Sequence, residues 1–299
     1  MRGAAGSGAA AAGRGAAPVA QRRVTVAAGA GVDLSVAVWG PAGSRPDNPL
    51  RPVLLVHGLA SNARLWDGVA ALLAAEGHPV AAVDQRGHGL SSKPETGYDF
   101  DTLAADLLAV VDGLGWEGHQ PVVAGQSWGG NVVLHLAARH QSRVAGLVLV
   151  DGGTIELSRR FPSWEQAASA LAPPPLDGVE AAAFEDMIRR SHPDWPETGI
   201  AGTLANVEVL ADGTIRPRLS RENHMTILRH LWEHHPSDLF PLVVAPAVLL
   251  MARGGVASPD ELAAAATSLR SCEVRWVDGD HDIHAQHPGL VASAIGGLC

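Results

Sequence analysis

The sequence predicts an α/β protein whose mostly parallel sheet is flanked by helices. Several continuous apolar runs, typical of strands buried on both faces, alternate along the chain with segments of helical periodicity. Polar loops follow these runs, where open α/β sheets build their sites. A chain of 299 residues with 46% apolar residues is long enough to fill one large core that carries an insertion.

The expected strands and helices follow one another in regular order. Two segments of alternating polarity, 23–26 and 32–39, predict antiparallel edge strands, and a Pro-rich connector spans 41–52. The expected buried strands are Val53–Val56, Val80–Val83, 121–126, Ala145–Val150, Ala247–Ala252 and Glu273–Val277. The expected helices are 63–76, 99–114, 128–140 and 259–269, with a short closing helix beyond Pro288.

The alternation of strands and helices stops at Thr154 and resumes after Phe240. We therefore expect a core made of residues 21–153 and 241–299, and a helical cap made of residues 154–240. Residues 1–20 are almost all Ala and Gly, which predicts a disordered tail rather than a signal peptide.

Composition excludes several classes of partner. A net charge of −9 without a Lys/Arg cluster argues against a nucleic-acid groove and an anionic membrane surface, since both need concentrated positive charge. The longest apolar stretch, 239–252, is interrupted by Pro241 and Pro246, so we expect no membrane span. Two cysteines, Cys272 and Cys299, favour a reducing, cytoplasmic location. The expected partner is a small molecule.

The most informative stretch has a serine with a glycine two residues before it and another two residues after it, where an apolar run ends and a helix begins. In the pattern Gly125-Gln126-Ser127-Trp128-Gly129 the serine takes a strained backbone conformation, and a Cβ at either glycine would collide with the neighbouring strand or helix. Such a turn holds a serine hydroxyl clear of its surroundings. It therefore predicts that Ser127 is a nucleophile.

Three further loops complete the pattern: His57-Gly58, 84–89 (Asp-Gln-Arg-Gly-His-Gly) and Gly279-Asp280-His281. With these motifs the chain resembles the α/β-hydrolase superfamily from about residue 23 to 298. The resemblance implies an eight-stranded, mostly parallel sheet with a helical cap inserted after the sixth strand. It also implies an oxyanion loop at His57-Gly58 and a catalytic-histidine loop at His281.

The chemistry of a serine nucleophile needs a base, an acid and oxyanion donors. His281 is the candidate base, because an unperturbed imidazole suits proton transfer near neutral pH. The resemblance implies that the backbone N–H groups of Leu59 and Trp128 are the oxyanion donors. In the same superfamily the acid most often follows the seventh strand, but residues 252–258 contain no carboxylate.

Two residues remain as the acid that orients His281. Asp151 follows the sixth strand, which is the second location used in the superfamily, and it keeps the order Ser, Asp, His along the chain. Asp260 is the alternative. A loop aspartate can also simply cap a Gly-Gly turn, so a structural role for Asp151 stays open as well.

The expected cap concentrates aromatic residues in a chain in which they make up only 4%. Trp164, Trp195 and Trp232 are candidates for the wall of a substrate pocket above Ser127, although core packing is the commoner role for any single aromatic residue. Histidine groups around His281 and His230 lack the spacing of a metal site, so we expect neither a metal nor a cofactor.

These observations predict a serine hydrolase that cleaves a small-molecule ester, thioester or lactone through an acyl-enzyme. The serine turn is also similar to that of proline iminopeptidases, and carbon–carbon bond hydrolases and cofactor-free haloperoxidases resemble the whole pattern. Epoxide hydrolases and haloalkane dehalogenases are disfavoured, because the resemblance would require an aspartate at Ser127. A ligand-binding homologue without useful catalysis is the alternative from a different class.

Overall fold

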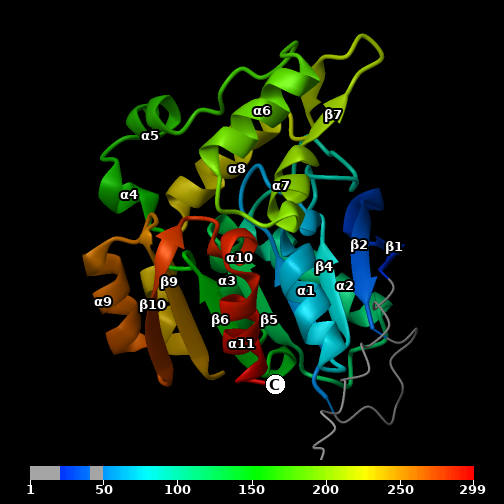
Figure 1. Ribbon diagram of the computed structural model, residues 1–299. Coiled ribbons are helices and arrows are strands. Elements are labelled where there is room, and N and C mark those ends of the chain that lie inside the picture. The colour runs from blue at the N-terminus through cyan, green and yellow to red at the C-terminus, as the bar shows by residue number, and fades with distance from the viewer. Residues whose placement is uncertain (1–20, 41–49) are drawn as a thin grey trace, which may run out of the picture.

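The computed structural model describes residues 21–40 and 50–299. The expected tail at residues 1–20 and most of the expected connector at 41–52 lie outside the described residues. In the described part, one large sheet forms the middle layer of the molecule, helices cover both of its faces, and a further layer lies above the carboxyl ends of its parallel strands (Figure 1).

The large sheet has eight strands in the order β1-β2-β4-β3-β5-β6-β9-β10. Strand β2 runs antiparallel to both of its neighbours, β1 and β4, and every pair from β4–β3 to β9–β10 is parallel. This confirms the predicted eight-stranded, mostly parallel sheet. The strands are Arg22–Ala27 (β1), Asp33–Trp39 (β2), Val53–Val56 (β3), Val80–Val83 (β4), Val122–Gln126 (β5), Gly146–Val150 (β6), Ala247–Gly254 (β9) and Cys272–Asp280 (β10).

The apolar runs bury both faces of their strands. In β3, Leu54 and Val56 face one cluster of buried residues, whereas Val53 and Leu55 face another, as the two-residue period of a strand requires. The first cluster includes residues of Phe100–Gly113 (α2), Trp128–Arg139 (α3) and Pro259–Ser268 (α9). The second includes residues of Asp67–Ala75 (α1), Ile283–Gln286 (α10) and Pro288–Gly296 (α11).

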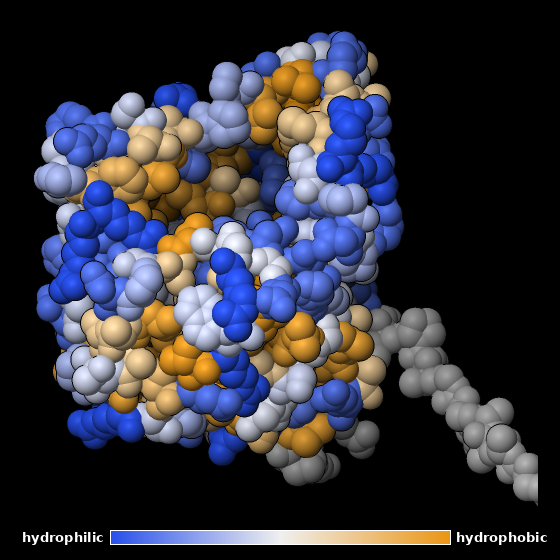
Figure 2. Space-filling model, turned by 60° about the vertical axis from the view of Figure 1, so that its left-hand side comes forward, coloured by the Kyte–Doolittle hydropathy of each residue, from blue (hydrophilic) through white to orange (hydrophobic). Residues whose placement is uncertain are grey.

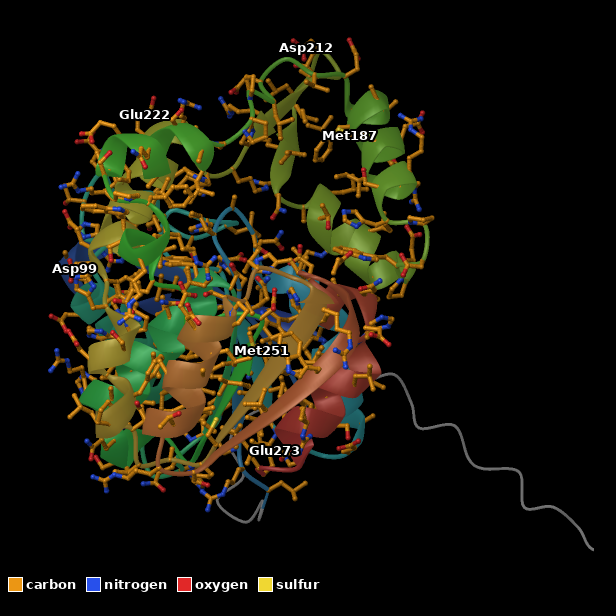
Figure 3. All side chains as sticks on the ribbon, turned by 90° about the vertical axis from the view of Figure 1, so that its left-hand side faces the viewer. Asp99, Met187, Asp212, Glu222, Met251 and Glu273 are labelled. Carbon is orange, nitrogen blue, oxygen red and sulfur yellow. The ribbon has the colours of Figure 1, made fainter. Side chains whose placement is uncertain are left out.

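The segment between β6 and β9 forms the layer above the sheet. Its helices are Leu157–Arg160 (α4), Trp164–Ala170 (α5), Ala181–Ser191 (α6), Glu197–Leu204 (α7) and Arg221–Glu233 (α8). In Figure 3, Glu222 and Met187 lie in this upper layer, whereas Met251 lies within the sheet layer below. That this layer is a separate cap with boundaries at residues 154 and 240 stays a prediction.

The upper layer also contains a small hairpin that the helical expectation did not include. Val207–Val209 (β7) and Ile215–Pro217 (β8) pair antiparallel around a turn at Asp212-Gly213. Gly213 has a φ of 85°, a left-handed conformation that glycine adopts without strain. An Asp-Gly dipeptide between β-branched residues is a strong hairpin signal, so this element could have been read from the sequence.

A buried ion pair ties the loop after β4 to helix α2. Arg86 donates two hydrogen bonds to the Asp106 carboxylate, at 2.6 and 2.7 Å, and the side chains are only 4% and 6% exposed. Removal of one partner would leave the other charge buried and unpaired.

Asp106→Ala is expected to lower the free energy of unfolding by about 3–5 kcal/mol, because the buried Arg86 guanidinium loses the carboxylate that neutralises it. Urea unfolding measures the change. Asp112→Ala is the matched control, since Asp112 pairs with Arg143 at a much more exposed position, and its expected cost is below about 1 kcal/mol. Equal losses in the two variants would contradict the account.

Candidate active site

The serine turn lies where β5 ends and α3 begins. Ser127 has a φ of 53° and a ψ of −126°, a strained conformation for a residue with a side chain, and its N–H donates to Val150 O at 3.0 Å. A Cβ at Gly125 would lie 2.3 Å from Gly129 O, and one at Gly129 would lie 2.3 Å from His57 O. Both glycines are therefore required by close backbone approach, as the pattern predicts.

The sheet order brings the other predicted residues to the same edge. Strands β5, β6, β9 and β10 are consecutive parallel neighbours, so the loops that follow them lie side by side. His281 Nδ1 donates to Asp151 Oδ2 at 2.6 Å. With Nδ1 protonated and bound in this way, Nε2 of the ring is the free acceptor. Asp260 lies elsewhere, exposed in the first turn of α9.

The Asp151 carboxylate is held by the loop that follows β9. Its Oδ1 accepts from the Ala252 N–H at 3.2 Å, and its Oδ2 accepts from the Val256 N–H at 3.0 Å. A Cβ at Gly255 would lie 2.1 Å from Oδ2, so only glycine permits this approach. The loop that lacks an acid thus supplies backbone donors to the acid of the neighbouring strand.

The surroundings of His281 favour its protonated form. Burial alone would lower its pKa, but the hydrogen bond to Asp151 and the nearby charges of Asp282 and Asp280 outweigh this effect and raise the pKa above its ordinary value. The Ser127 hydroxyl has no hydrogen-bond partner among the described residues. Catalytic contacts of this kind often tighten only when substrate binds.

Two backbone N–H groups near Ser127 are unpartnered within the described chain, those of Leu59 and Trp128. These are the two groups predicted to be oxyanion donors. Trp128 begins α3, where the free N–H groups of the first turn carry partial positive charge. Leu59 belongs to the loop that follows β3.

Two buried histidines fix the Leu59 loop. His57 donates through Nδ1 to Gly58 O at 2.7 Å and accepts the Gln85 N–H at 3.0 Å. His88 accepts the Ala60 N–H through Nε2 at 3.3 Å, and its ring stacks on Trp128 with centroids 5.4 Å apart. Burial lowers the pKa of both histidines, so each ring stays neutral and can accept through Nε2.

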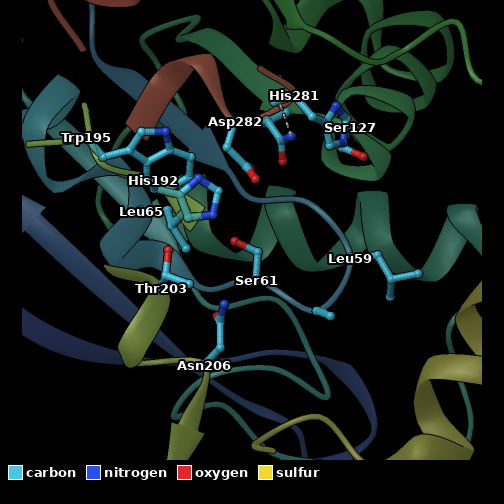
Figure 4. A pocket seen from close by; sticks show the side chains of 12 residues that line it. Leu59, Ser61, Leu65, Ser127, His192, Trp195, Thr203, Asn206, His281 and Asp282 are labelled. Carbon is cyan, nitrogen blue, oxygen red and sulfur yellow. Dashed lines mark hydrogen bonds between the residues drawn. The ribbon is translucent and has the colours of Figure 1, made fainter. Parts of the chain in front are cut away.

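A cavity of about 130 Å³ opens beside the serine turn (Figure 4). Ser127, His281 and Leu59 line it, and α7 with its flanking residues forms the opposite wall. The molecule is also visibly hollowed between the upper layer and the sheet layer, with many apolar residues around the hollow (Figure 2). The nucleophile turn therefore faces a space between the two layers.

Of the three predicted tryptophans, only Trp195 lines this cavity. Trp164 and Trp232 lie apart from it. The Arg229 guanidinium lies 5.2 Å from each of their ring centroids, and Trp232 Nε1 donates to Phe161 O at 3.1 Å. These two residues thus pack the upper layer, which is the commoner role of an aromatic side chain.

The cavity wall also contains polar residues that the sequence motifs did not indicate: Ser61, His192, Thr203, Asn206 and Asp282. Only Asp282 carried a signal, because it adjoins His281. The described residues hold no group of three or more potential metal ligands. Among the helices of residues 21–40 and 50–299, none combines the length and apolarity that a membrane span needs.

Comparison with known proteins agrees with this fold. Residues 51–195 match the family model described as the alpha/beta hydrolase fold. The chain is 38% identical over 127 residues to a non-heme chloroperoxidase of Streptomyces lividans, covering 42% of this chain and 43% of that protein. It is 37% identical over 155 residues to lipase LipV of Mycobacterium tuberculosis, covering 51% and 54% respectively.

Among solved structures, E-2-(acetamidomethylene)succinate hydrolase superposes with a TM-score of 0.76 at 23% identity, over 94% of this chain and 98% of that one. At that identity the likeness shows the fold alone. The chain spans about half the length of the two curated relatives described above. The matched segment and the superposition show that the chain has the α/β-hydrolase fold.

The raised pKa of His281 can be measured directly. In an NMR titration of the wild-type protein, the ring is expected to titrate above the ordinary histidine range, and in Asp151→Asn its pKa is expected to fall, because burial remains while the charged acceptor is lost. The buried His284 ring, whose pKa burial lowers to about 3, serves as a reference that does not titrate above about pH 5.

The raised pKa of His281 also determines how the stability of the folded state changes with pH. Protonated His281 stabilises the folded state fully below its unfolded-state pKa, and this contribution is lost as the pH rises through the higher folded-state pKa. An unchanged His281 pKa in Asp151→Asn would show that the hydrogen bond between them does not control the ring.

Proposed function

We propose that the protein is a serine hydrolase that cleaves a small-molecule ester, thioester or lactone through an acyl-enzyme. The observation that carries the proposal is the 2.6 Å hydrogen bond from His281 to Asp151, which leaves the other ring nitrogen free beside the cavity that Ser127 lines. The relatives named lipase and chloroperoxidase support a reaction at a small-molecule substrate.

In the proposed reaction, Ser127 Oγ attacks the substrate carbonyl carbon while His281 Nε2 takes the hydroxyl proton. The carbonyl electron pair moves to oxygen, and the N–H groups of Leu59 and Trp128 stabilise the oxyanion. The intermediate collapses, the bond to the leaving group breaks, and His281 returns the proton to that group. Water then repeats the sequence on the acyl-enzyme and releases the acid.

The proposed role of Asp151 is to hold the imidazole in one tautomer and to stabilise its cation. Its carboxylate is fully buried and keeps three donors: the His281 ring and the N–H groups of Ala252 and Val256. A fixed acceptor of this kind loses little freedom when the ring becomes charged.

Ser127→Ala is expected to abolish hydrolysis of p-nitrophenyl esters and labelling by a serine-directed fluorophosphonate, because the attacking oxygen is gone. Ser61→Ala is the matched control, since Ser61 lines the same cavity but is not in the nucleophile turn. This variant should still be labelled by the fluorophosphonate. Labelling that survives in Ser127→Ala would defeat the proposal.

Asp151→Asn is expected to lower turnover by about 10³- to 10⁴-fold, because an amide cannot stabilise the imidazolium and favours the wrong tautomer. Circular dichroism should show an intact fold. Asp260→Asn removes the same charge from the exposed first turn of α9 and should leave turnover within about twofold of wild type. The reverse pattern would assign the acid to Asp260.

A further inference from the structure

The cavity beside Ser127 contains a carboxylate that no role described so far uses. Asp282 lines the cavity, and in Figure 4 its side chain points toward the cavity interior between His192 and Ser127. Within the described chain its carboxylate oxygens have no hydrogen-bond partner. Asp282 precedes α10, but its side chain does not cap that helix. A local structural role therefore does not explain it.

The neighbouring carboxylate, Asp280, is already engaged. Its Oδ1 accepts the Asp282 N–H at 3.0 Å, and its Oδ2 accepts Trp195 Nε1–H at 3.1 Å. His192 Nδ1 lies 3.6 Å from the same Oδ2. Asp280 thus positions the Trp195 ring in the cavity wall, whereas the Asp282 carboxylate is left available.

No lysine or arginine lines this cavity. Burial raises the pKa of Asp282, and the nearby Asp280 and Asp151 raise it further, while His281 and His192 only partly compensate. A carboxylate that is withdrawn from water without a cation is unfavourable until a positive group reaches it. A positive group that reached Asp282 would therefore stabilise its carboxylate.

Aromatic side chains line the same cavity as Asp282. The Trp195 ring lines the cavity and lies 3.9 Å from the His192 ring, centroid to centroid. Indole faces attract ammonium groups within about 6 Å of the ring centroid. A carboxylate and aromatic side chains in one small cavity are complementary to an organic cation and repel an anion.

We propose that this cavity binds a positively charged ammonium group of the substrate, with Asp282 as the residue that selects for it. The inference rests on the proposed hydrolase function, since the cation would lie on the acyl or the alcohol side of the bond that Ser127 attacks. Thr203 and Asn206 supply polar groups on the opposite wall of the cavity. Substrates with a carboxylate at the same position are expected to be excluded.

Matched substrates test the selection. On the alcohol side, choline butyrate carries a quaternary ammonium group, and 3,3-dimethylbutyl butyrate has carbon in place of that nitrogen. On the acyl side, the p-nitrophenyl ester of 4-(trimethylammonio)butyric acid is the cation, and that of 5,5-dimethylhexanoic acid is its neutral counterpart. In at least one pair, wild-type kcat/KM is expected to favour the cation by about tenfold or more. The measured quantity is the ratio within a pair.

Asp282→Asn is expected to bring that ratio close to one, whatever it does to the absolute rates. Asp278→Asn is the control, since Asp278 lies in β10 four residues before Asp282, is 92% exposed and pairs with Arg253 outside the cavity, so the ratio should persist. Ratios of one or below in both wild-type pairs, or a ratio unchanged in Asp282→Asn, would overturn the proposal.

A binding measurement separates this inference from the proposed function. Ser127→Ala cannot form an acyl-enzyme, so calorimetric titration with the intact esters reports binding alone. The variant is expected to bind the cationic ester of the preferred pair more tightly than its neutral partner, and Ser127→Ala/Asp282→Asn to lose the difference. If the wild-type protein hydrolyses none of these esters, the hydrolase proposal fails, but the titration still tests the cation site. Equal binding of the cationic and the neutral ester would overturn the cation-site proposal.

Discussion

The rest of the candidate site depends on the hydrogen bonds that the Asp151 carboxylate accepts. This carboxylate is fully buried, and an ionised carboxylate in such a position must receive hydrogen bonds from several donors. It receives them from Ala252, Val256 and His281, which belong to two other strand-to-loop junctions. One side chain thus joins the loops after β6, β9 and β10, and it sets both the tautomer of the His281 ring and the path of the β9 loop.

Close backbone contacts and histidine hydrogen bonds hold the serine turn and the Leu59 loop in place. A Cβ at Gly129 would meet His57 O, and one at Gly152 would lie 2.2 Å from Ser127 O, so the serine turn is enclosed by main chain on several sides. His57 and His88 then tie the Leu59 loop to the loop after β4 through neutral rings. The unpartnered N–H groups of Leu59 and Trp128 are therefore held in place before any substrate arrives, which is what electrostatic preorganisation requires.

Most of the features that the sequence predicts correctly follow from local patterns. The strands, the serine turn and the order of the loops follow from apolar runs and glycine spacing, and these effects act over a few residues. Asp151 could be proposed because the loop after β9 has no acid. The donation from Val256 could not be foreseen, because it depends on how a loop without periodicity folds back over the neighbouring strand.

The upper layer was the least predictable part, since tertiary contacts decide where its side chains point. Trp164 and Trp232 contact Arg229 rather than the cavity, whereas Trp195 is turned toward it by Asp280. Aromatic content alone cannot distinguish these cases. Thr203 and Asn206 reach the cavity from α7 and the residues just after it, and no motif marked them.

The central claim is that Ser127 becomes covalently acylated during turnover. Intact-protein and peptide mass spectrometry of a quenched reaction with a p-nitrophenyl ester tests it most directly. The account predicts one acyl group per chain, located on the peptide that contains Ser127 and removed again as substrate is exhausted. Turnover without an acylated Ser127, or an acyl group that forms on another residue at the rate of turnover, would contradict it.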